Sequence, residues 1–166
     1  MTSKILAFAG STRTDSFNKK LIRVAVKGAE AAGAEVTLID LRDLPMPRYD
    51  GDLEEKEGVP PNGRRLKELM KSHSGFLLSC PEYNSSITGV LKNAIDWASR
   101  EEEGEKPLVC FRGKTAALMS ASPGVLVLPD QAAGIYRFFR RLIGLMARKI
   151  TTATMRKCTV SSRKIP

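Results

Sequence analysis

Short apolar runs alternate with amphipathic segments along the first 120 residues, and this alternation constrains the fold more than any other feature. A continuous apolar run is typical of a parallel strand covered on both faces, whereas apolar residues at helical spacing predict a helix. Strands alternating with helices predict a doubly wound parallel α/β sheet. The predicted strands are 5–9, 35–39, 75–79 and 114–120, and the predicted helices are 16–33, 64–72 and 89–99.

Two connections depart from this regular pattern. Residues 40–63 are rich in proline and acidic side chains, which is typical of a long irregular loop that is functional or mobile. Residues 125–128 resemble a strand directly after the loop 121–124, although neighbouring parallel strands need a crossover of about a dozen residues or more. Three alternatives follow: this strand is antiparallel, it is not a strand, or a crossover is absent.

Charge divides the chain at Asp130. The formal net charge is +9, and the residues after Asp130 include nine basic and no acidic side chains, so the preceding part is neutral. We therefore expect a domain of residues 1–130 and a basic C-terminal segment of residues 131–166, which either belongs to the same domain or forms a tail. Residues 137–148 suit a basic amphipathic helix for anionic membranes or nucleic acid. A packed surface helix or an unstructured tail is the preferred alternative, so binding to a membrane or to nucleic acid is not expected.

The cysteines and the histidine predict neither a metal site nor a catalytic base. Cys80, Cys110 and Cys158 are an odd number without metal-ligand spacing, which indicates free thiols and a cytoplasmic protein. His73 is the only histidine, and we expect it on the solvated surface. No apolar run approaches the roughly 18 residues of a membrane span.

The loop from Gly10 to Asn18 joins the first predicted strand to the first predicted helix. The N-terminus of a helix exposes unpaired N–H groups and the positive end of a dipole, which suits a phosphate. Ser11, Ser16 and Asn18 offer short polar groups, and the guanidinium of Arg13 matches phosphate geometry. The alternative is a plain helix cap at Ser16. Neither the dinucleotide fingerprint nor the P-loop is present.

A second polar loop, beginning at Pro81, follows the third predicted strand. Tyr83 can lie against a flat ring, and the backbone N–H groups from Glu82 onward can bond the polar edge of that ring. The alternative is an ordinary strand-to-helix turn formed by Asn84 and its neighbour. Trp97 is expected in the core or a subunit interface. Because open α/β sheets bind ligands at the carboxyl ends of their strands, the two loops predict a nucleotide or flavin site.

Together, these loops resemble the NADPH-dependent FMN reductase family of flavodoxin-like proteins, which includes quinone, chromate and azo-dye reductases. The first is similar to the family's G-S-x-R-x-x-S-x-N phosphate loop. Residues 81–97 are similar to its P-E-Y-N-x-S-x-x-G-x-L-K-N-A-x-D-W signature. Residues 120–124 resemble the family's third loop, and the resemblance covers residues 4–124.

The resemblance implies a strand order of 2-1-3-4-5, with FMN bound at the topological switch point between strands 1 and 3. It implies that NADPH passes a hydride to flavin N5 and that a quinone, flavin, azo or metal-oxyanion acceptor then takes it, so no protein acid or base is required. The implied site residues are Ser11, Arg13, Ser16, Phe17 and Asn18 at the phosphate, Pro81, Glu82, Tyr83 and Asn84 at the isoalloxazine ring, and Ser120 at the ribityl chain or ring edge.

The chain departs from the family after Gly124. Family members continue with a glycine-rich loop and a helix before the last strand, whereas residues 125–131 here resemble that last strand directly. The last crossover is therefore expected to be missing. The resemblance implies a homodimer or homotetramer whose interface includes the affected region. Two alternative functions are a flavodoxin-like electron carrier that does not oxidise NADPH, and an inactive variant that acts through its basic C-terminal segment.

Overall fold

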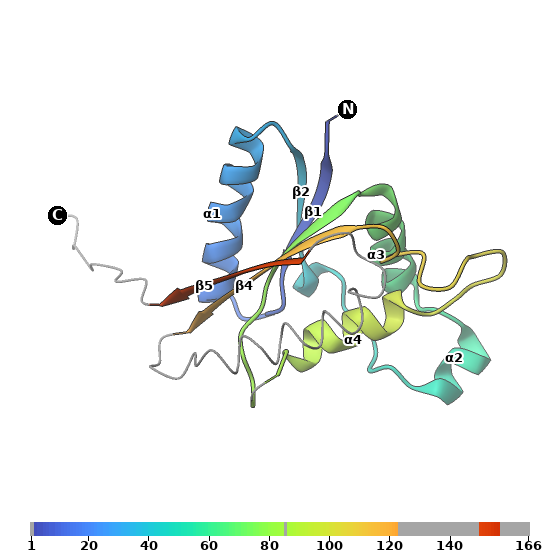
Figure 1. Cartoon of the computed structure of the whole chain (residues 1–166). Helices are drawn as coiled ribbons and strands as arrows, with labels where there is room; N and C mark the ends of the chain where they lie inside the picture. Colours follow the sequence, from blue (N-terminus) through green and yellow to red (C-terminus); the bar gives the residue numbers. More distant parts are fainter. Residues whose placement is uncertain (1, 85, 123–149, 157–166) are drawn as a thin grey trace.

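A five-stranded parallel sheet forms the centre of the protein in the computed structural model, which describes residues 2–84, 86–122 and 150–156 (Figure 1). The strand order is β2-β1-β3-β4-β5, and all four neighbouring pairs are parallel. This confirms the predicted α/β class and the predicted order 2-1-3-4 of the first four strands. The strands are β1 (Lys4–Ala9), β2 (Glu35–Asp40), β3 (Gly75–Ser79), β4 (Thr115–Ser122) and β5 (Ile150–Arg156).

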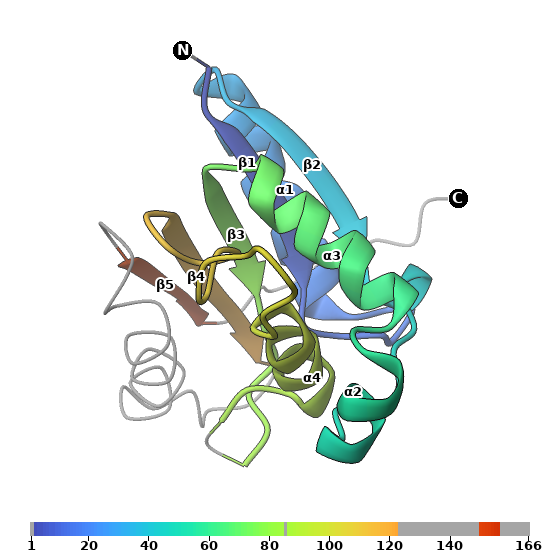
Figure 2. The ribbon, with the colours of Figure 1, turned by 90° about the vertical axis from the view of Figure 1, so that its right-hand side faces the viewer.

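Helices cover both faces of this sheet, as Figures 1 and 2 show: α1 lies on one face, and α3 and α4 lie on the other. The alternation of side chains along β1 explains both layers. Leu6 and Phe8 belong to the large core cluster under α3 and α4, whereas Ala7 packs with Ile22 and Val26 of α1. The helices are α1 (Phe17–Ala31), α2 (Gly51–Glu57), α3 (Pro61–Ser72) and α4 (Gly89–Ala98).

The fifth strand lies where the sequence did not predict one. β5 pairs in parallel with β4, from Ala116 opposite Ile150 to Ser122 opposite Arg156. Residues 123–149 join the two strands, and they are long enough for the crossover that a parallel pair requires. The structure therefore does not support the missing crossover expected from the sequence. The predicted strand 125–128 lies outside the described residues.

The connection between β2 and α3 is more regular than its composition indicated. It contains a 3-10 helix (Leu41–Asp43) and the short helix α2. Asp50 caps α2, because its carboxylate accepts hydrogen bonds from the N–H groups of Asp52 and Leu53. The expectation of an irregular segment was wrong because α2 has no buried residue and so leaves no apolar period in the sequence.

His73 is buried, not solvated as we expected. Nδ1 lies 2.6 Å from the carbonyl oxygen of Leu69, and Nε2 lies 2.8 Å from the hydroxyl of Thr37. Both ring nitrogens are therefore used to join the end of α3 to β2. Trp97 is fully buried, as the core alternative predicted.

None of the helices in the described ranges is long and apolar enough to cross a bilayer. Within the same ranges, no group of three or more His, Cys, Asp and Glu side chains has the geometry of a metal site.

Candidate functional site

Two loops and the end of β4 meet at the carboxyl edge of the sheet, where β3 lies between β1 and β4. Hydrogen bonding continues past the strand ends: the N–H of Gly10 donates to the carbonyl of Ser79 at 2.8 Å, and the N–H of Cys80 donates to the carbonyl of Met119 at 2.9 Å. The starts of the two loops and the end of β4 are therefore held side by side. The structure brings the two predicted loops and Ser120 together at one edge.

The first loop is ordered by its own serines. Ser16 is buried and caps α1, since its hydroxyl accepts a hydrogen bond from the N–H of Lys19 at 3.4 Å. The hydroxyl of Ser11 accepts from the N–H of Arg13, also at 3.4 Å. The side chain of Arg13 is exposed. The first turn of α1 has no acidic residue, so no carboxylate there opposes an anion at the positive end of the helix.

Two predicted site residues in α1 differ sharply in their exposure. Phe17 is 42% exposed at the start of the helix. Asn18 is 2% exposed, and its carboxamide bonds to Ser79 and Ala121. The side chain of Asn18 therefore points into the protein and is already occupied.

The second loop forms a tight hairpin beyond the strand ends. The backbone groups of Tyr83 and Ser86 exchange two hydrogen bonds of 3.0 Å, and Figure 2 shows this light-green segment projecting from the sheet. Asn84 has φ = 52°, a left-handed conformation that asparagine tolerates better than most residues. Tyr83 is 59% exposed, so its ring offers a flat surface to a ligand. Pro81 and Glu82, which precede it, are half-buried.

Ser120 supplies a buried hydroxyl in need of a partner. The residue is 7% exposed at the end of β4, and its Oγ makes no hydrogen bond within the described ranges. An unpaired buried hydroxyl costs free energy, so such a group calls for an explanation. A polar ligand at this edge provides one.

Neither Cys80, which starts the second loop, nor Cys110, which bonds to Lys67 of α3, is set up as a nucleophile. Burial raises the pKa of the Cys80 thiol, which donates to the carbonyl of Pro81 at 3.1 Å. Burial also raises the pKa of Cys110 to about 11. The thiolate is the reactive form, so both cysteines have structural roles at neutral pH.

Sequence reasoning missed two residues of this edge, Ser79 and Thr88. Both are buried, and both connect the loops through hydrogen bonds. Thr88 had a detectable signal, because a threonine directly before a helical segment is a common N-cap. Ser79 had none, since a serine at the end of an apolar run fits an ordinary strand end equally well.

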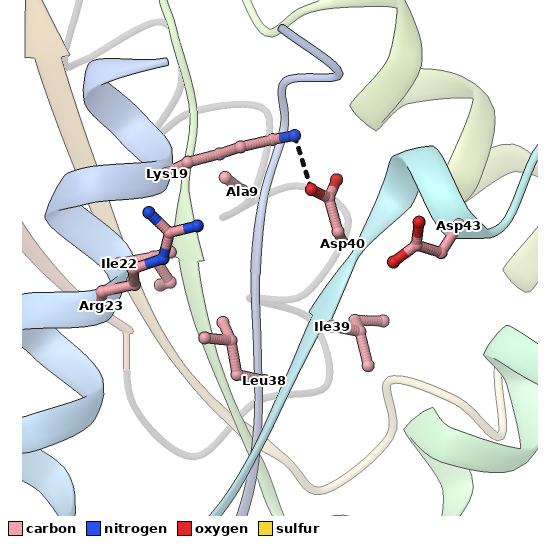
Figure 3. Close-up of a pocket in the computed structure, with 8 residues that line it drawn as sticks. All are labelled: Ala9, Lys19, Ile22, Arg23, Leu38, Ile39, Asp40 and Asp43. Atoms are coloured by element: carbon pink, nitrogen blue, oxygen red, sulfur yellow. Dashed lines mark hydrogen bonds and ion pairs between the residues drawn. The ribbon is translucent and has the colours of Figure 1, made fainter. Parts of the chain in front are cut away.

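A separate cavity of about 220 Å³ lies between α1 and β2 (Figure 3). The ammonium of Lys19 crosses it to Asp40, with Nζ and Oδ2 2.5 Å apart. Burial alone would raise the pKa of Asp40, but hydrogen bonds from Lys19 and the N–H of Arg42 outweigh it and lower that pKa. The cavity contains none of the predicted site residues; its lining is Ala9, Lys19, Ile22, Arg23, Leu38, Ile39, Asp40 and Asp43.

Comparison with known proteins identifies relatives for most of the chain. The sequence profile described as "NADPH-dependent FMN reductase" matches residues 3–131. The NAD(P)H-dependent FMN reductase PA1204 of Pseudomonas aeruginosa is 40% identical over 121 residues, which are 73% of this chain and 60% of that protein. The quinone reductase of Escherichia coli K12 is 36% identical over 123 residues, 74% of this chain and 62% of that protein. The chain thus spans less than two thirds of either relative.

A solved structure shows the same architecture. FerB, a flavoenzyme NAD(P)H:(acceptor) oxidoreductase from Paracoccus denitrificans, superposes with a TM-score of 0.68 at 31% identity. The match covers 95% of this chain and 77% of that one. The azoreductase AzrA, at 18% identity and a TM-score of 0.68, shares the fold.

Proposed function

The chain belongs to the NADPH-dependent FMN reductase family, and from that premise we propose that it is an FMN-dependent NAD(P)H oxidoreductase. Its two sequence relatives named above are an FMN reductase and a quinone reductase. We extend the proposal to a small-molecule acceptor of the quinone, flavin, azo or metal-oxyanion class. The observation that carries it is the convergence of two loops and the end of β4 on one sheet edge, with the buried Ser120 hydroxyl lacking a partner among the described residues.

The phosphate of FMN fits the first loop. The N-terminus of α1 supplies N–H donors, and its first turn holds no carboxylate. We propose that Ser11, Arg13 and Ser16 bind the phosphate, with Arg13 as the charged partner. Phe17 and Asn18 contribute their backbone N–H groups, since the carboxamide of Asn18 is already bonded.

The ring of FMN fits the second loop. We place the isoalloxazine beside Pro81, Glu82, Tyr83 and Asn84, and the ribityl chain or ring edge beside Ser120. The bound flavin supplies the hydride chemistry, and the protein supplies binding and orientation. Because the ring of Tyr83 is exposed, NADPH can reach the flavin from this side of the site, and the electron acceptor can follow NADPH there.

Flavin binding and reduction test this proposal. Protein reconstituted with FMN is expected to be yellow and to bleach when NADPH is added without oxygen. An electron carrier would bind FMN yet stay oxidised with NADPH. Failure of the wild-type protein to bind FMN would refute the site.

A pair of arginine variants locates the phosphate. Arg13→Ala removes a charged hydrogen-bond donor, so the Kd for FMN is expected to rise about tenfold or more. Arg65 is also exposed but lies in α3, so Arg65→Ala is the matched control and leaves the Kd unchanged. Fluorescence titration measures both, and equal effects in the two variants would contradict the assignment.

Assembly and location belong to the same proposal. The family resemblance favours a homodimer or homotetramer, which light scattering of the purified protein measures. The buried thiols of Cys80 and Cys110 are free, in keeping with a reducing cytoplasm. Division into a domain of residues 1–130 and a segment of residues 131–166 stays a prediction. Within that segment, β5 pairs with the central sheet.

A further inference from the structure

We propose that the side chains of Asn18 and Thr88 are positioning residues that hold the two loops and the end of β4 as one preformed cradle. The proposal rests on the proposed function, because the cradle is the FMN site described above. It gives Asn18 a different task from that of a phosphate ligand, and it gives a task to Thr88, which occupies a variable position of the signature.

The carboxamide of Asn18 joins α1 to β3 and β4. Its Nδ2 donates to the carbonyl of Ala121 at 3.0 Å, and its Oδ1 accepts from the N–H of Ala121 at 3.0 Å. Oδ1 also accepts from the hydroxyl of Ser79 at 2.8 Å. Asn18 thus pairs with the backbone of β4 through both a donor and an acceptor, much as a neighbouring strand would.

The hydroxyl of Thr88 joins the second loop to the first. It donates to the carbonyl of Gly10 at 2.6 Å and accepts from the N–H of Leu91 at 3.3 Å. One side chain therefore caps α4 and ties that helix to the start of the phosphate loop. Thr88 is 2% exposed, so water does not compete freely for these bonds.

These two residues connect both loops of the site with the end of β4, and neither is positioned to contact a ligand with its side chain. Their bonds span 61 to 103 residues of sequence, so folding, not ligand binding, orders the loops. A site ordered before binding gains affinity because no ordering cost remains when the ligand arrives. Ser120 precedes Ala121 directly, so the Asn18 pairing also holds the backbone next to Ser120, whose hydroxyl has no partner among the described residues.

Two near-isosteric variants remove the connections. Asn18→Asp replaces the amide donor facing the Ala121 carbonyl with a carboxylate oxygen. Thr88→Val removes the hydroxyl and keeps the shape, whereas Thr88→Ser keeps the hydroxyl and is the rescue variant. Thr37→Val is the matched control, because it removes a hydroxyl bonded to His73 at 2.8 Å, outside the cradle.

The measured quantities are the Kd for FMN by fluorescence titration and the Tm of the FMN-free protein. Asn18→Asp and Thr88→Val are expected to raise the Kd about tenfold or more, while Thr88→Ser and Thr37→Val stay within about twofold of wild type. The positioning role is refuted if Asn18→Asp and Thr88→Val bind FMN with the Kd of the wild type. It is also refuted if Thr37→Val lowers the Tm by the same amount as these two variants and loses as much affinity for FMN.

Hydrogen exchange tests the cradle without flavin and without any variant. In the FMN-free wild-type protein, the amide of Ala121 is expected to exchange as slowly as the core amides of β3. Rapid exchange there would overturn the preformed cradle. This separates the two proposals: a wild-type protein that fails to bind FMN refutes the proposed function, whereas a labile Ala121 amide refutes the cradle.

Discussion

Gly10 lies where the first loop passes closest to α4. A Cβ atom at this position would lie 3.0 Å from Cys80 Sγ and 3.0 Å from Leu91 Cβ, closer than ordinary van der Waals contact. Gly28 is its opposite, since it lies inside α1 and a Cβ there would meet nothing within 4 Å. Close packing therefore explains the glycine at position 10, whereas packing against the described residues does not explain the glycine at position 28.

The same substitution at these two positions is expected to act in opposite directions. Gly10→Ala crowds a packed contact and should lower the stability by about 1–3 kcal/mol. Gly28→Ala reduces the freedom of the unfolded chain and should raise the stability by about 0.4–1 kcal/mol. Thermal unfolding of both variants measures this, and a stable Gly10→Ala protein would show that α4 can shift away from the loop.

At the scale of elements, α4 anchors the connection that precedes α3. Asn93 accepts from the N–H of Tyr49 at 2.7 Å and donates to the carbonyl of Pro47 at 2.9 Å. Trp97 Nε1 donates to the same carbonyl at 2.9 Å, and its ring meets Tyr49 edge to face. The second half of the signature therefore fixes a neighbouring loop, whereas the first half forms the hairpin of the candidate site.

Asn93→Ala is expected to loosen residues 45–50, because it removes both hydrogen bonds of that side chain to the loop. Limited proteolysis should cut this segment faster than in the wild type. Lys92→Ala is the control on the same helix: it breaks only an exposed pair with Asp96, worth about 0–1 kcal/mol. Equal cleavage of the two variants would mean that the loop is held by other contacts.

At the scale of the whole molecule, a buried lysine joins the loop after α4 to α3. Lys67 is 1% exposed, and its ammonium lies 2.7 Å from Glu102 and 2.5 Å from Glu105. Burial alone would raise the pKa of Glu105, but hydrogen bonds from Lys67 and Lys71 outweigh it and lower the pKa to about 2. Protonation of a glutamate in this network would leave the buried charge of Lys67 with one ionic partner fewer, so the stability of the folded protein depends on pH.

The sign of this dependence follows from the lowered pKa. Glu105 has a reference value of 4.5, so its stabilising effect is complete above about pH 5 and is lost as the pH falls toward about 2. The Tm difference between wild type and Glu105→Gln is therefore expected to be largest near neutral pH and to shrink in acid. Glu103→Gln, at an exposed position of the same loop, should show no such trend. A Tm difference between wild type and Glu105→Gln that does not change with pH would refute the lowered pKa of Glu105 as the cause.

The strands, helices and side-chain positions of the fold were predictable from the sequence to different degrees. Runs such as 5–9 and 75–79 are continuously apolar, so strands β1 and β3 were evident. β5 was not, because its sequence Ile-Thr-Thr-Ala-Thr-Met-Arg has no continuous apolar run. The helix α2 was missed because it buries nothing, and His73 was misplaced because its partners come from Thr37 and Leu69.

The sequence by itself determined the α/β class and the two polar loops, because these depend on local patterns of apolar and turn-forming residues, whereas the strand order followed from the resemblance to a known family. Tertiary structure alone decided the orientation of Asn18, the connecting role of Thr88 and the unpartnered state of Ser120 among the described residues. A motif names the polar side chains of a loop, but their partners lie up to 103 residues away. Whether such a side chain faces a ligand or another loop is therefore settled only when the strands are in register.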